Sequence, residues 1–234
     1  MNLILLLEED FTGPGRASIT GRRFKHVQEV HRAAVGDVLT VGLLGGAMGR
    51  GRVTGLGEAL HLEVELDQPP PPKLPLTLVL ALPRPKVLNR VLAAATSLGV
   101  ADIYLVNAWK VEKSYWKSPR LEEGNLLEQR ILGLEQARDT VLPGLHLRRL
   151  LRPFAEEELP GLLRGTTPLL AHPGVTESCP REIHGPATLV IGPEGGFIPA
   201  EIELLTRCGC RAVNMGDRIL RVETAVAALV GRLF

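Results

Sequence analysis

Apolar residues in the second part of the chain alternate between short uninterrupted runs and longer stretches with helical spacing. The runs predict strands at residues 76–82, 103–107, 145–150, 167–172, 187–192 and 211–215. The helical spacing predicts helices at residues 87–98, 124–138, 154–163, 199–208 and 222–233. Because several strands are apolar on both faces and helices separate them, we expect a parallel sheet covered on both sides.

The first 68 residues follow a different pattern. Runs with strand character occur at residues 3–7, 38–44, 51–56 and 60–66, and the last of these alternates apolar and polar residues. One short helix is expected at residues 25–34. Residues 69–75 contain five prolines and form a stiff spacer. The pattern therefore predicts a small β-rich domain at residues 1–68 and an α/β domain at residues 76–234.

Three of the predicted strands in the α/β domain run into loops rich in glycine or proline. Residues 189–191 lead into Gly192-Pro-Glu-Gly-Gly, and Pro199 then suits the first turn of a helix. Residues 212–215 lead into Gly216, and residues 169–172 lead into Pro173-Gly174. Glycine loops let a polar ligand approach the backbone, although a tight turn without a ligand has the same signature.

Composition and charge exclude few functions. The chain has 234 residues, is 45% hydrophobic and 23% charged, and carries a net charge of +1, so it lacks the strongly basic character of many nucleic-acid binders. Residues 11–57 nevertheless hold seven Lys or Arg residues against Glu29 and Asp37. This stretch is either a modest basic patch or a solvated surface.

The cysteines and the apolar runs indicate a cytoplasmic protein. Three cysteines are too few for a disulfide framework, and Cys208-Gly-Cys210 has no companion ligands at zinc spacing, so we expect no metal site. Residues 1–7 lack the basic flank of a signal peptide and are expected to form a strand. No apolar run approaches the roughly 20 residues of a membrane span.

Two motifs resemble one family. IGPEGGF at residues 191–197, followed by MGDRILRVETA at residues 215–225, resembles the RsmE-type ribosomal RNA methyltransferases of the SPOUT class. Residues 26–37 resemble the N-terminal PUA-like domain of that family, and weaker matches occur at residues 85–100 and 135–143. The Rossmann and P-loop signatures are missing from the sequence, and the glycine loops come last along the chain rather than after the first strand.

The resemblance implies a C-terminal α/β trefoil-knot (SPOUT) domain, a small N-terminal PUA-like β-barrel, and S-adenosylmethionine as the cofactor. The three loops would bind it through Leu170, His172, Ile191, Gly192, Pro193, Gly195, Met215, Gly216, Ile219 and Leu220. The glycines would allow close approach of the ligand. For Ile191, Ile219 and Leu220 the alternative is packing in the core.

The resemblance also suggests residues for catalysis and RNA binding. Arg221, Glu223 and Arg138 are the candidates for catalysis, although Arg221 and Glu223 could instead form a surface salt bridge in the first helical turn. The candidates for contact with the RNA are Arg22, Lys86, Arg90 and Gln136. Lys86 and Arg90 are four residues apart, which suits neighbouring phosphates and equally a solvated helix face.

The implied reaction is methyl transfer from S-adenosylmethionine to N3 of a uridine in small-subunit (16S) ribosomal RNA. The resemblance further implies a homodimer that acts on the assembled small subunit. Two alternatives remain open at this point: methylation of another nucleotide or of a tRNA, and a non-catalytic RNA-binding module whose glycine loops are only structural.

Overall fold

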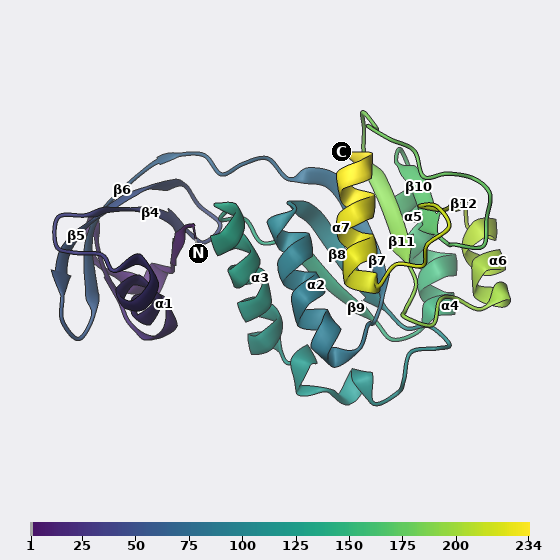
Figure 1. The fold of residues 1–234 in the computed structure, drawn as a ribbon, viewed down its shortest axis with the longest axis horizontal. Coiled ribbons are helices and arrows are strands. Elements are labelled where there is room, and N and C mark those ends of the chain that lie inside the picture. The colour runs from purple at the N-terminus through teal and green to yellow at the C-terminus, as the bar shows by residue number, and fades with distance from the viewer. Residues whose placement is uncertain (1) are drawn as a thin grey trace. The chain divides into compact units, whose positions relative to one another are not determined.

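The computed structural model describes residues 2–234, in which the strands form two six-stranded sheets (Figure 1). The chain divides into two compact units. One contains the residues up to Pro72 together with Ile131–Leu142, and the other contains Lys73–Arg130 together with Pro143–Phe234. The protein therefore has a mixed α/β fold with one curled mixed sheet and one parallel sheet.

The sheet of the N-terminal unit has the strand order β1-β4-β5-β6-β3-β2. Its strands are β1 Ile4–Leu6, β2 Phe11–Gly13, β3 Arg16–Ile19, β4 Val38–Leu43, β5 Met48–Leu56 and β6 Leu60–Gln68. Strands β1 and β4 are parallel, and the other neighbours are antiparallel. Helix α1, Gly21–His26, continues into a single π-helical turn at Val27–His31.

Long strands β5 and β6 curl because their pairing contains two register shifts, which bend and twist a sheet. Gly49 lies beside the first shift, and a Cβ atom at this position would approach the Glu65 carbonyl oxygen to 1.9 Å. Only glycine permits this close pairing of the two backbones.

Strand β1 is buried on both faces. Ile4 and Leu6 belong to the main core of the unit, whereas Leu3 and Leu5 pack on the opposite face with Leu134 from the segment Ile131–Leu142. This double burial explains the unbroken apolar run and confirms that residues 3–7 contain a strand.

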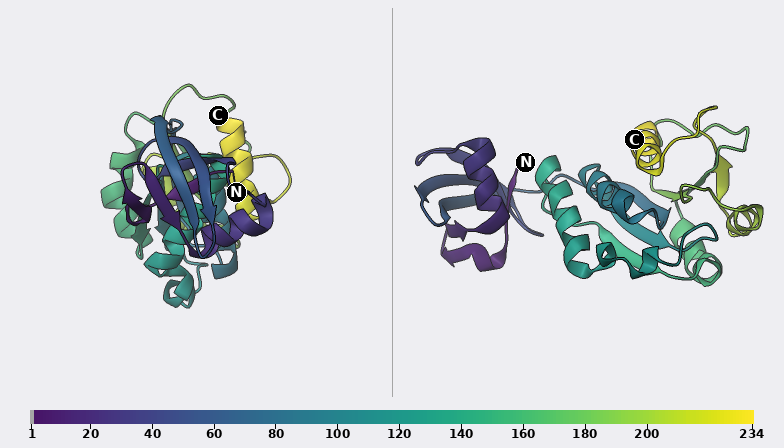
Figure 2. Two further views of the ribbon diagram at one scale, coloured as in Figure 1. Left: turned by 90° about the vertical axis from the view of Figure 1, so that its left-hand side faces the viewer. Right: turned by 60° about the horizontal axis from the view of Figure 1, so that its bottom comes forward.

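The parallel sheet has the strand order β12-β10-β11-β7-β8-β9, and all neighbouring strands are parallel. Its strands are β7 Leu74–Ala81, β8 Val100–Val106, β9 Gly144–Arg148, β10 Thr167–Ala171, β11 Ala187–Ile191 and β12 Arg211–Val213. The main helices are α2 Pro85–Ser97, α3 Glu123–Ala137, α6 Pro199–Arg207 and α7 Val222–Leu233. Helices α2 and α7 pack against each other, as the views in Figures 1 and 2 show.

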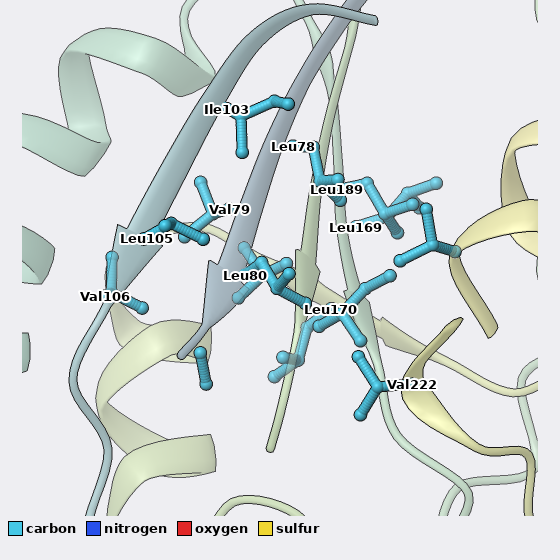
Figure 3. Close-up of a cluster of buried hydrophobic side chains, with 14 of the residues drawn as sticks. Leu78, Val79, Leu80, Ile103, Leu105, Val106, Leu169, Leu170, Leu189 and Val222 are labelled. Carbon is cyan, nitrogen blue, oxygen red and sulfur yellow. The ribbon is translucent and has the colours of Figure 1, made fainter. Parts of the chain in front are cut away.

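The core of this unit surrounds the central strands (Figure 3). Leu78 of β7 pairs in register with Ile103 of β8 on one side and Leu189 of β11 on the other, and all three side chains are fully buried. Because these strands lie in the middle of a sheet with helices packed on it, they bury both faces and show no alternation.

The predicted strands and helices of the α/β domain are confirmed, with boundaries that differ by a few residues. The predicted helix at residues 154–163 is broken into α4 Leu151–Pro153, a π-helical turn at Phe154–Glu158 and α5 Leu159–Leu163. Strands β2 and β3 were not predicted, because they are short and flank the turn-forming Gly13-Pro14-Gly15. Among residues 2–234, no helix is both long and apolar enough to cross a membrane.

Candidate functional site

A cavity of about 350 Å³ opens where β10, β11 and β12 end. Because these strands are parallel and neighbouring, their carboxyl ends meet at one edge of the sheet, where α/β folds bind ligands. The walls of the cavity come from residues 171–173, 191–197, 213–216 and 218–220, from one face of α7 and from Lys110.

The structure brings together most of the residues predicted to bind the cofactor. The predicted residues that line the cavity are His172, Ile191, Gly192, Pro193, Gly195, Met215, Gly216, Ile219 and Leu220. Leu170 does not line it. Its side chain is fully buried in the core that also contains Val222 (Figure 3), and the next residues, Ala171 and His172, form the wall instead.

The loop between β11 and α6 is a tight turn that side chains would disturb. Gly196 has φ +69° and donates its N–H to the Pro193 carbonyl at 2.7 Å. A Cβ atom on Gly192 would lie 3.1 Å from the ring and 3.2 Å from the backbone nitrogen of Phe197. A side chain at Gly192 would therefore push against both the ring and the backbone of the same turn.

Two hydrogen bonds tie this loop to distant parts of the same unit. The Glu194 carboxylate accepts the Arg84 backbone N–H at 3.0 Å, at the start of α2. The Lys110 ammonium donates to the Gly195 carbonyl at 2.7 Å. These contacts hold the glycine loop at two neighbouring residues, so its shape does not depend on local sequence alone.

Helix α6 begins without a Ser or Thr cap. Pro199 occupies its first turn, and the buried Glu201 carboxylate accepts the Ile198 N–H at 3.0 Å. The other oxygen of Glu201 accepts the Trp109 N–H at 2.7 Å. The Glu201 carboxylate thus accepts a free backbone N–H at the start of α6 and also fixes the segment that follows β8.

The loop between β12 and α7 forms the third wall. Gly216 has φ +101° and donates its N–H to the Asn214 side-chain oxygen at 3.0 Å. Ile219 lines the cavity and is nevertheless 83% exposed. A ligand in the cavity would cover this apolar side chain, which favours binding.

The chemistry of the lining suits an organic ligand with apolar surfaces and polar edges. The charged side chains in the wall are Lys110, Glu194 and Arg218, none of which is among the predicted cofactor-binding residues. Lys110 is far from the motifs in sequence, so no local signal indicates it. Within residues 2–234 no three His, Cys, Asp or Glu side chains are placed to hold a metal ion. Cys210 is buried outside the cavity lining, and its burial raises the pKa of its thiol to about 12.

The residues at the start of α7 form contacts with α2. Arg221 is exposed directly before the helix, and Glu223 forms an ion pair with Arg90 at 3.6 Å rather than with its own neighbour in sequence. Lys86 is exposed one turn before Arg90 on α2. The structure therefore joins Arg90, a predicted RNA contact, to Glu223, a predicted catalytic residue, across these two packed helices.

The other predicted RNA-contacting residues belong to the N-terminal unit. Arg22 forms two hydrogen bonds with the buried Glu135 carboxylate, at 2.9 and 3.1 Å. Burial raises the pKa of Glu135, and Arg22 opposes that shift. The backbone carbonyl of Gln136 accepts a hydrogen bond from the Asn2 side chain, and Arg138 follows α3 with φ +55°. Their proposed roles in RNA binding and catalysis stay predictions.

The RNA methyltransferase domain family matches residues 70–233, which include every wall of the cavity. The chain belongs to the RNA methyltransferase family. A ribosomal RNA small subunit methyltransferase E from Treponema pallidum is 31% identical over 97% of this chain and 88% of its own length. Another, from Mycobacterium bovis, is 29% identical over 64% of this chain and 58% of its own.

The fold of this RNA methyltransferase is shared by a solved structure. The ribosomal RNA small subunit methyltransferase E from Neisseria gonorrhoeae, bound to S-adenosyl methionine, superposes with a TM-score of 0.74. The match covers 98% of this chain and 95% of the other at 22% identity. The resemblance read from the two sequence motifs is confirmed.

Proposed function

We propose that this methyltransferase transfers the methyl group of S-adenosylmethionine to N3 of a uridine in small-subunit (16S) ribosomal RNA. One observation carries the proposal: nine of the ten residues that the family motifs predict for cofactor binding line a single cavity. The names of the relatives and the cofactor bound to the Neisseria protein support the same substrate and methyl donor.

The cavity fits the proposed methyl donor. Its volume of about 350 Å³ lies in the range of small-molecule sites. The apolar side chains of Ile191, Ile219 and Leu220 offer surfaces for the adenine ring of the donor. The glycine turns leave room for the polar edges of that ring to approach the backbone. The donor supplies a methyl group on a positively charged sulfur.

The chain must hold the uracil and remove a proton from it. The N3 nitrogen becomes a good nucleophile only after its proton leaves, and a neighbouring cation lowers the cost of that step. We assign the role of this neighbouring cation to Arg221, which directly precedes the cavity-lining Val222. The role of Arg138 rests on the family resemblance alone. Glu223 is the best candidate to accept the proton, and its ion pair with Arg90 also positions that guanidinium for RNA phosphate.

The finer topology is also a proposal. Residues in the connection between β10 and β11 hydrogen-bond to the end of α7: Glu182 N–H to the Arg232 carbonyl at 3.1 Å, and Ile183 N–H to the Leu233 carbonyl at 2.7 Å. Strand β12 returns past β11 to pair with β10. These contacts support a trefoil knot in which the last helix is enclosed by the 172–186 connection.

The remaining parts of the proposal concern partners. The curled sheet of residues 1–68 is assigned as a PUA-like RNA-binding barrel, on the resemblance of residues 26–37. A homodimer and an assembled small subunit as substrate follow from the family resemblance. The expected compartment is the cytoplasm.

Calorimetric titration with S-adenosylmethionine tests the proposal directly. The parent protein should bind it, and Gly195→Trp should not, because the indole would occupy the cavity beside Lys110. Gly124→Trp is the matched control, since Gly124 is exposed and a Cβ there meets no atom within 4 Å. Failure of the parent to bind would remove the methyltransferase activity from consideration and leave an RNA-binding module.

The product is identified by incubating the protein with unmodified small subunits or with free 16S RNA. Methylation at N3 blocks Watson–Crick pairing, so reverse transcription should stop at the modified uridine. A methyl group on another atom or only on tRNA would contradict the proposed substrate.

A further inference from the structure

The chain has two tryptophans, and both lie in the segment that follows β8. Trp116 is anchored: its indole N–H donates to the Asn107 side chain at 2.9 Å, and the Arg149 guanidinium lies 5.6 Å from its ring. Trp109 is 78% exposed, and in the described part of the chain none of the ring contacts involves it. So large an exposed indole is unfavourable in water unless something covers it.

The backbone of Trp109 is fixed beside the cavity. Its N–H donates to the buried Glu201 carboxylate at 2.7 Å, and the next residue, Lys110, lines the cavity and bonds to Gly195 at 2.7 Å. The exposed ring is therefore mounted on an anchored loop, where little conformational freedom would be lost on binding.

The charges that follow Trp109 in the sequence favour an anionic partner. Between Trp109 and Arg120 the chain carries four basic residues and the single acid Glu112. The basic residues are Lys110, Lys113, Lys117 and Arg120. An exposed aromatic ring among positive side chains is the combination by which proteins bind single-stranded nucleic acid, since the ring stacks on a base and the cations meet phosphates.

We propose that Trp109 stacks on an unpaired base of the substrate RNA next to the methylated uridine. This inference rests on the proposed function. Because N3 lies on the Watson–Crick edge of uracil, the target must leave its pair before methyl transfer, and its neighbour loses a stacking partner. The Trp109 indole replaces that partner and holds the opened strand beside the cavity.

Steady-state methylation of unmodified small subunits tests the proposal with Trp109→Ala and Trp109→Phe. Loss of the ring should raise KM for the RNA about 5- to 100-fold with a small change in kcat, because base–aromatic stacking contributes that range of affinity. Phe should restore most of the loss, since it retains a ring that can stack. S-adenosylmethionine affinity by calorimetry should match the parent for both variants.

Other outcomes separate the two proposals. An unchanged KM for Trp109→Ala overturns the stacking role while the methyltransferase function stands. If sedimentation shows that Trp109→Ala turns a dimer into a monomer, and the KM change follows only from that dissociation, the ring belongs to the contact between copies of the chain. This outcome also overturns the stacking role. If the parent methylates no RNA, the proposed function itself fails.

Discussion

The cavity of the parallel sheet and the basic stretch of the N-terminal unit differ in how their residues are used. In the cavity, residues from three loops converge on one space with glycines at the tight positions. In the basic stretch, carboxylates already meet several cations: Arg23 pairs with Asp10, and Arg22 with Glu135. The convergence of three loops on one cavity therefore indicates a ligand site more directly than local charge does, because charge is neutralised by partners far along the chain.

Gly192→Val should have the largest effect, because it introduces a branched side chain against the ring and backbone of Phe197 in the cavity wall. We expect S-adenosylmethionine affinity to fall at least about 100-fold, which corresponds to roughly 2.7 kcal/mol. Calorimetry measures the affinity, and loss of the thermal shift caused by the ligand provides a second readout. Gly57→Val in the N-terminal unit is the control, because a Cβ there meets no atom within 4 Å. Equal affinity of the two variants would contradict a site defined by glycine.

Arg22→Gln should destabilise the N-terminal unit, because it leaves the Glu135 carboxylate buried without its guanidinium partner. Since Arg22 is 40% exposed, we expect a loss of about 2 kcal/mol in the free energy of unfolding at neutral pH, below that of a fully buried pair. Urea denaturation measures it. The double variant Arg22→Gln with Glu135→Gln should recover much of the loss.

The loss of stability caused by Arg22→Gln should depend on pH in a defined direction. Burial raises the pKa of Glu135 in the folded state above the ordinary glutamate value of 4.5. The folded protein therefore holds this proton more tightly than the unfolded chain, and stability falls as pH rises from 4.5 through the raised pKa. A protonated Glu135 needs no cation, so the deficit of Arg22→Gln should shrink as the pH is lowered through that window. An identical deficit at pH 5 and pH 8 would contradict a buried ion pair.

Arg90→Gln tests whether the charge of Arg90 stabilises the fold or binds RNA. Arg90 is 65% exposed, so loss of its ion pair with Glu223 should change the free energy of unfolding by less than about 1 kcal/mol. KM for the RNA should rise several-fold, and the dependence of binding on salt should weaken by about one phosphate contact. Filter binding at several salt concentrations checks this. An unaltered salt dependence would mean that Arg90 contacts no RNA phosphate and is only a solvated surface residue.

Arg50→Gln should have the smallest effect. Arg50 lies opposite Glu65 in the register of β5 and β6, so a carboxylate already faces it. We expect changes below about 0.5 kcal/mol in stability. RNA affinity should change less than about twofold, because Glu65 beside Arg50 repels a phosphate and offsets the positive charge. A larger loss of RNA affinity would show that the curled sheet contacts RNA through this strand.

Sequence patterns predicted the elements whose signal is local. Uninterrupted apolar runs located the strands of the parallel sheet, and the resemblance of the loops to one family located nine cavity-lining residues. Leu170 was the exception, because a strand residue next to a loop can point into the core as readily as into the site.

Features that depend on distant partners could not be predicted. Nothing near Leu134 in sequence shows that it packs on Leu3 and Leu5, and nothing near Lys110 shows that it reaches the glycine loop. The Arg22–Glu135 pair also joins residues far apart in the chain. Such contacts arise only when the fold brings the segments together, whereas periodicity records only which face of an element is buried.

The order of the cavity residues along the chain has a consequence for synthesis. Apart from Lys110, all of them lie between Ala171 and Leu229, so a ribosome completes β7, β8 and β9 long before it makes the walls of the site. One edge of β7 therefore stays open until β11 emerges and pairs with it. A chain released before β11 would expose that edge and lack the cavity, so such an unfinished copy would be inactive and available to chaperones or proteases.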